Sequence, residues 1–157
     1  MKTQPLILRK DQERRLLAGH GWIYRNEIDT QATPLKGFTP GQPVEILSDH
    51  ERWIGHGYVN PHSLICARIV SRDRSHPLSP ALWIQRIRDA LTLRERLYKR
   101  PFYRLVFGES DGLPGLIVDR YDGLLCVQIT TAGMERVRGE ILAALEQVIR
   151  PQAIVLR

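Results

Sequence analysis

Phe102 to Ile129 reads FYRLVFGESDGLPGLIVDRYDGLLCVQI, and this stretch decides the fold of the second half of the chain. Its apolar, β-rich runs are separated by two glycine-containing breaks that are typical of turns. Asp122-Gly123, in the second break, is favoured in two-residue hairpins, where both central residues need positive φ. The stretch therefore predicts a meander of three antiparallel strands.

A helix and a last strand are predicted after the meander. Beyond Thr131, apolar residues recur at steps of three and four, and Pro151 ends the pattern: Met134, Val137, Ile141, Leu145 and Val148. Residues 153–156 then have β-type composition. Residues 101–157 are thus expected to form a small ββαβ-type domain, incomplete at its C-terminal strand.

A long helix is predicted just before the meander, in a linker segment that spans residues 77–100. Ser79 is a suitable N-cap, and Pro80 fits the first helical position. Arg94 falls at the centre of the apolar face of this helix, where a guanidinium kept from water needs a charged partner. The nearest plentiful carboxylates in the sequence are Glu109 and Asp111. We expect Arg94 to bridge to one of them as a structural clasp.

The first 76 residues show many short strand signals and little helix. Short β-type runs are joined by turns rich in Gly, Pro and Asn, at 6–8, 22–24, 44–47, 52–59 and 64–70. This pattern predicts a closed or nearly closed small β-barrel and, with the rest of the chain, an α+β protein.

Basic residues are concentrated in the first hundred residues. This part holds 17 Lys and Arg against 10 Asp and Glu, whereas residues 101–157 hold 6 against 7. A basic surface attracts phosphate backbones without reading sequence, which indicates a polyanion as partner. A solvated, Arg-rich surface with no partner is the alternative that charge alone leaves open.

The string GESDGLPGLIVDRY (108–121), preceded by YRLVF, resembles the bacterial ribosomal RNA large subunit methyltransferase I family. GYVNPHSLICARIVS (57–71) is similar to the last strands of the PUA domain of that family. The resemblance implies a PUA domain at 1–76, the linker helix at 77–100 and a central αβ domain at 101–157. In the family, an S-adenosylmethionine-binding Rossmann domain follows and methylates carbon 5 of a cytosine in 23S ribosomal RNA.

The resemblance implies that this chain is the RNA-binding, non-catalytic part of such an enzyme. Its expected partners are ribosomal RNA and the catalytic domain, and S-adenosylmethionine is expected only for that further domain. The loop between the first helix and the next strand is implied to contact RNA. The expected contact residues are Arg9, Lys10, Arg14, Arg15, His20, Trp22 and Arg25. His20-Gly21-Trp22 departs from the His-Pro-Trp of many family members, and core packing is an alternative role for Trp22.

Several acidic residues and the two cysteines raise the question of functions other than RNA binding. Four carboxylates, Glu109, Asp111, Asp119 and Asp122, could form a metal or acid–base site, but turns and local charge pairing explain them. Cys66 and Cys126 interrupt β-type runs and are expected to be buried, reduced thiols. A protein-interaction adapter, a stand-alone PUA RNA-binding protein and a homodimer remain alternatives. No apolar run is long enough to span a membrane, so a cytoplasmic protein is expected.

Overall fold

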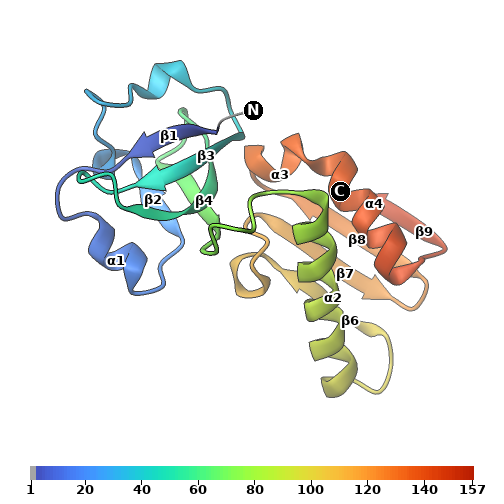
Figure 1. Ribbon diagram of the computed structural model, residues 1–157. Helices are drawn as coiled ribbons and strands as arrows, with labels where there is room; N and C mark the ends of the chain where they lie inside the picture. Colours follow the sequence, from blue (N-terminus) through green and yellow to red (C-terminus); the bar gives the residue numbers. More distant parts are fainter. Residues whose placement is uncertain (1–2) are drawn as a thin grey trace. The chain divides into compact units, whose positions relative to one another are not determined.

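The computed structural model describes residues 3–157 and divides the chain into two compact units, one up to Leu78 and one from Ser79 to Arg157 (Figure 1). Each unit contains one sheet with its own apolar core. The sequence predicts a separate linker at residues 77–100. In the structure, the helix of this segment packs within the second unit.

The first unit is a five-stranded sheet in the order β1-β3-β4-β5-β2. Strand β1 runs parallel to β3, and the other neighbours are antiparallel. The elements of this unit are β1 (Gln4–Ile7), α1 (Glu13–Leu17), β2 (Trp22–Tyr24), η1 (Arg25–Glu27), η2 (Leu35–Gly37), β3 (Gln42–Leu47), β4 (Trp53–Val59) and β5 (Ile65–Ser71).

Backbone contacts beyond the two edge strands, β1 and β2, close this sheet into a small barrel. Leu8, just after β1, forms an antiparallel bridge with Ile28, which follows β2 and η1. The Arg9 amide donates to the Glu27 carbonyl at 2.8 Å, and the Asp29 amide donates to the Ile7 carbonyl at 2.9 Å. The predicted small β-barrel is therefore confirmed.

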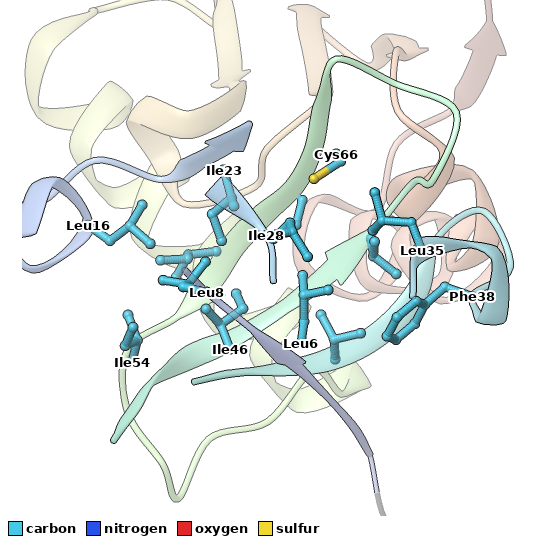
Figure 2. Close-up of a cluster of buried hydrophobic side chains, with 14 residues drawn as sticks. Leu6, Leu8, Leu16, Ile23, Ile28, Leu35, Phe38, Ile46, Ile54 and Cys66 are labelled. Atoms are coloured by element: carbon cyan, nitrogen blue, oxygen red, sulfur yellow. The ribbon is translucent and has the colours of Figure 1, made fainter. Parts of the chain in front are cut away.

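Fourteen buried apolar residues fill this barrel (Figure 2). Strands β4 and β5 approach so closely that a Cβ at Gly57 would collide with the Arg68 carbonyl oxygen. His56 beside it lies inside β4, 5% exposed, with Nε2 3.2 Å from the Arg74 carbonyl. His56 is therefore a buried residue of the strand and not a turn residue.

The second unit is a four-stranded sheet in the order β6-β7-β8-β9, with β9 parallel to β8 and the other pairs antiparallel. The predicted meander is β6 to β8. The elements are α2 (Pro80–Leu97), β6 (Phe102–Phe107), η3 (Gly108–Asp111), β7 (Leu116–Tyr121), β8 (Leu124–Ile129), α3 (Ala132–Arg136), α4 (Arg138–Ile149) and β9 (Ala153–Leu156).

Helices α2 and α4 pack against each other beside this sheet (Figure 1). The Ser79 hydroxyl caps α2 by accepting from the Leu82 amide at 3.4 Å, as the sequence predicts. The inward face of the sheet carries Leu116, Val118, Leu125 and Val127, all buried. A β-bulge in β6 allows two consecutive residues, Leu105 and Val106, to be buried together.

Two local features differ from the sequence expectations. The single helix predicted after Thr131 is two helices, α3 and α4, because Val137 between them has φ −104° and ψ 17°. The hairpin at Asp122-Gly123 has the predicted register, with Tyr121 opposite Leu124. Of its two central residues, Asp122 has positive φ (58°), whereas Gly123 lies outside the left-handed region.

No helix among residues 3–157 has the length and apolar character needed to cross a membrane.

Candidate nucleic-acid interface

A basic cleft of about 750 Å³ opens on the surface of the first unit. Three cationic residues line it, Arg9, Arg25 and Lys36, and all three are exposed. The rest of the lining is Asn26, Thr30, Pro34, Leu35 and Leu64. The barrel fold brings these segments together, because the chain after β1 pairs with the chain after β2. We call this feature the basic cleft.

The two arginines of the basic cleft each donate to a backbone carbonyl. Arg9 Nε donates to the Ile28 carbonyl at 3.1 Å, and Arg25 Nη1 donates to the Pro61 carbonyl at 3.3 Å. Within residues 3–157, no carboxylate lies at ion-pair distance from Arg9, Arg25 or Lys36. Their charge is therefore available to an anionic ligand, and the exposed Leu64 adds an apolar wall.

Arg15, expected to contact RNA, has internal partners instead. Its Nη2 lies 2.8 Å and 2.9 Å from the two carboxylate oxygens of Glu27 and 2.9 Å from the Trp22 carbonyl. The Glu27 side chain is 10% exposed and also accepts from the Tyr24 amide at 2.6 Å. Arg15 therefore neutralises a buried carboxylate and fixes the chain around β2.

Four other expected RNA-contact residues lie on the surface around α1 and β2. Lys10 and His20 are exposed, and the Arg14 side chain is 80% exposed with an ion pair to Asp11 at 3.2 Å. Trp22 is 40% exposed, and the Arg68 guanidinium lies 5.9 Å from the centre of its ring. Ile23, not Trp22, is the core residue of β2, so the alternative of core packing does not hold for Trp22.

Arg72 positions the loop between α1 and β2. Its Nη1 donates to the Leu16 carbonyl at 2.8 Å, and its Nη2 donates to the His20 carbonyl at 2.7 Å. These two bonds tie the end of β5 to the loop that carries His20 and precedes Trp22. Sequence reasoning missed this role, because Arg72 stands 52 residues beyond His20 in a polar segment.

Arg94 forms a two-pronged ion pair with Asp111 in the second unit. Its Nη1 and Nη2 lie 2.6 Å and 2.7 Å from the two carboxylate oxygens, and the side chains are 12% and 7% exposed. Arg94 Nε also donates to the Arg104 carbonyl at 3.1 Å, and Asp111 accepts from the Phe107 amide at 2.7 Å. The clasp thus uses Asp111, while Glu109 of the same turn is exposed.

The carboxylates considered for catalysis are engaged in local structure. Asp119 pairs with Arg104 across neighbouring strands at 2.9 Å, Asp111 holds Arg94, and Asp122 forms the hairpin turn. In the part of the chain that the structure describes, no three His, Cys, Asp or Glu side chains are grouped so as to hold a metal ion.

Cys66 is buried in the core of the first unit and lacks the surroundings of an activated nucleophile. Burial raises the pKa of the Cys66 thiol from 9.0 to about 11, so this thiol is protonated at neutral pH. Cys126 is a half-buried free thiol on β8. Catalysis by a thiolate therefore finds no support at Cys66.

The geometry defines a small β-barrel with an open basic cleft, followed by an αβ unit. In agreement, residues 6–72 match the model of the PUA-like domain family. Two solved structures share the fold over 99% of this chain. One is described as a methyltransferase complexed with SAH, with a TM-score of 0.81 and 40% of its chain covered. The other is described as an S-adenosylmethionine-dependent methyltransferase from Streptococcus mutans, with a TM-score of 0.80 and 41% of its chain covered. Both are 19% identical in sequence.

Curated relatives with similar sequences share one name. Ribosomal RNA large subunit methyltransferase I of Salmonella arizonae is 34% identical over 145 residues, which are 90% of this chain and 35% of that protein. The protein of the same name from Klebsiella pneumoniae is 33% identical over 152 residues, 95% of this chain and 37% of its own. The resemblance to this family is confirmed, and the chain spans about a third of the length of these relatives.

Proposed function

We propose that the first unit, residues 1–76 in the domain division expected from the sequence, binds structured RNA through the basic cleft. The observation that carries this proposal is the grouping of Arg9, Arg25 and Lys36 around one cavity with no carboxylate partner among residues 3–157. Phosphate contacts from such cations supply most of the sequence-independent affinity for nucleic acid. The names of the relatives make ribosomal RNA the partner that we propose.

The chain then serves as the RNA-binding part of an S-adenosylmethionine-dependent methyltransferase that acts on carbon 5 of a cytosine in 23S ribosomal RNA. The residues present do not fit S-adenosylmethionine. The strand–helix–strand unit β8-α3-α4-β9 has Thr130, Thr131 and a single glycine, Gly133, where a dinucleotide-type fold needs several glycines before its helix. We therefore place the methyl donor, and the chemistry, outside residues 3–157.

The second unit, by this proposal, connects the RNA-binding barrel to a catalytic methyltransferase domain. Docking of that domain, or of a second copy of the chain, is favoured by the outer edge of β9, where Val155 and Leu156 are 56% and 51% exposed. An adapter role of this kind is compatible with RNA binding by the first unit. A cytoplasmic location follows from a ribosomal RNA substrate.

Charge removal in the basic cleft tests the proposed function. Arg9→Gln with Arg25→Gln should weaken binding to a structured ribosomal RNA fragment about tenfold or more in a filter-binding assay, because two phosphate contacts are lost. The matched control is Arg52→Gln with Arg88→Gln, which removes two exposed arginines that do not line the cleft. Equal affinity of the cleft variant and the wild type would contradict the proposal.

Calorimetry tests the assignment of the cofactor. Titration of the chain with S-adenosylmethionine should give no saturable heat, because no glycine-rich cofactor loop is present. Saturable binding at micromolar concentrations would show that the chain itself contains a site for S-adenosylmethionine and would contradict the assignment.

A further inference from the structure

A second feature that combines aromatic and cationic residues lies in the second unit, where α2 ends and β6 begins. A shallow hollow of about 420 Å³ is lined there by Tyr98, Lys99, Arg100 and Phe102. We call it the aromatic hollow. All four residues are exposed, with Tyr98 at 52% and Phe102 at 51%. Two large aromatic rings that remain half exposed beside two cations are not explained by packing of this unit.

The rings of the aromatic hollow are held in place from behind. Tyr98 stacks on Tyr103 with ring centres 5.3 Å apart and planes inclined by 29°. The Tyr103 hydroxyl accepts from Arg120 Nη1 at 3.0 Å, which fixes the supporting ring in turn. Tyr98 is thus supported by Tyr103 and is still 52% exposed, so part of its ring remains open to a ligand in a defined orientation.

The cations of the aromatic hollow have no acidic partner. The Arg100 guanidinium lies 5.1 Å from the centre of the Phe102 ring. Among residues 3–157, no carboxylate lies within ion-pair distance of Lys99 or Arg100. Across the sheet, Phe102 is opposite Tyr121, which is 54% exposed and extends the aromatic surface onto β7.

We propose that the aromatic hollow binds an unpaired nucleotide of single-stranded RNA. The base stacks on the exposed part of the Tyr98 ring, Lys99 and Arg100 contact the adjacent phosphates, and Phe102 forms another wall of the hollow. Aromatic platforms beside cations are the means by which proteins bind single strands, since every base has a π-face. This site deepens the proposed function and rests on RNA being the ligand. It adds an unpaired segment to the structured RNA bound by the first unit.

Fluorescence anisotropy with two probes tests this site on the full chain. The probes are a labelled, unstructured RNA of ten nucleotides and the same strand annealed to its complement. Tyr98→Ala with Phe102→Ala should weaken binding of the single strand about fivefold or more and leave duplex binding unchanged. Tyr98→Phe keeps the ring and should bind as the wild type does, which shows that the ring and not the hydroxyl is needed; unchanged duplex binding by the double variant shows that it is folded.

The matched control is Phe107→Ala at the other end of β6. Phe107 is 53% exposed and also has an arginine, Arg104, 5.4 Å from its ring centre, but it lies outside the hollow. An equal loss with Phe107→Ala, or no loss with the double variant, would overturn the site. A double variant that changes only the oligomeric state in sedimentation would instead assign the hollow to a protein contact and also overturn it. The cleft variant Arg9→Gln with Arg25→Gln tests RNA binding by the first unit and leaves the aromatic hollow unchanged. Failure of one proposal can therefore be distinguished from failure of the other.

Discussion

Among single residues, Arg94 is one whose removal should clearly destabilise the second unit, because it pairs with the buried carboxylate of Asp111. Arg94→Met leaves the Asp111 carboxylate, 7% exposed, without its cation. We expect the free energy of unfolding to fall by roughly 3 to 5 kcal/mol, because an uncompensated charge stays buried. Urea denaturation followed by circular dichroism measures this loss.

The control for this prediction is Arg88→Met on the exposed face of α2. It should change stability by no more than about 0.5 kcal/mol, as exposed substitutions do. Equal losses for the two variants would show that the pair contributes no more than a surface arginine does.

The two thiols should differ in reactivity. Burial raises the pKa of Cys66 to about 11, whereas Cys126 is half buried. At pH 7.5 we expect a maleimide to label Cys126 in the folded chain and Cys66 only after unfolding, as peptide mass spectrometry can show. Rapid labelling of folded Cys66 would contradict its placement in the core.

The same pKa shift predicts a loss of stability at high pH. The folded state binds the Cys66 proton more tightly than the unfolded state, whose thiol pKa is near 9.0. This contribution is fully present below about pH 9 and is lost as the pH rises toward 11. The decline in unfolding free energy over this range should therefore be shallower in Cys66→Ala than in the wild type.

At the scale of elements, Arg72 should control the order of the loop between α1 and β2. Arg72→Met removes both hydrogen bonds to the carbonyls of Leu16 and His20. Amide hydrogen exchange in residues 17–21 should become faster, because local opening of this loop costs less free energy. Arg52→Met, an exposed arginine in a different turn, should leave this exchange unchanged; acceleration in both variants would deny Arg72 a specific role.

Most elements could be predicted from the sequence, because their signals are local. The Ser79 cap, the meander and the short barrel strands each depend on neighbouring residues, and all appear in the structure. The break between α3 and α4 could not be predicted, because the apolar repeat continues through Val137. The turn type at Gly123 could not be predicted either, because an Asp-Gly dipeptide is compatible with more than one type of turn.

The candidate site was predictable only in part. The sequence places Arg9 and Arg25 in a basic segment, but no local pattern shows that Lys36 joins them at one cleft. Arg15 belongs to the same basic segment, and only the fold reveals that Glu27 occupies it. Charge counting therefore finds the right region, while the partners of each cation depend on contacts between distant residues.

In the molecule as a whole, the cations of the basic first half fall into two groups. Some, such as Arg15, pair with a carboxylate, whereas Arg9 and Arg25 have no carboxylate partner among residues 3–157. Reversing the charge of Arg15 would leave Glu27 buried and unpaired, so a loss of RNA binding would not be distinguished from a loss of structure. Arg9 and Arg25 each donate to a backbone carbonyl, and no carboxylate among residues 3–157 pairs with them, so replacing them with Gln leaves no buried charge unpaired. These two arginines are the informative positions for RNA binding.

The salt dependence of RNA binding is the most direct test of whether the chain binds RNA through the basic cleft. The affinity of the chain for a structured ribosomal RNA fragment, measured between about 50 and 200 mM salt, should fall linearly on a double-logarithmic plot. Arg9→Gln with Arg25→Gln should reduce the slope by about 2, one for each lost phosphate contact. Affinity that is indifferent to salt, or a slope unchanged in the double variant, would contradict RNA binding through the basic cleft.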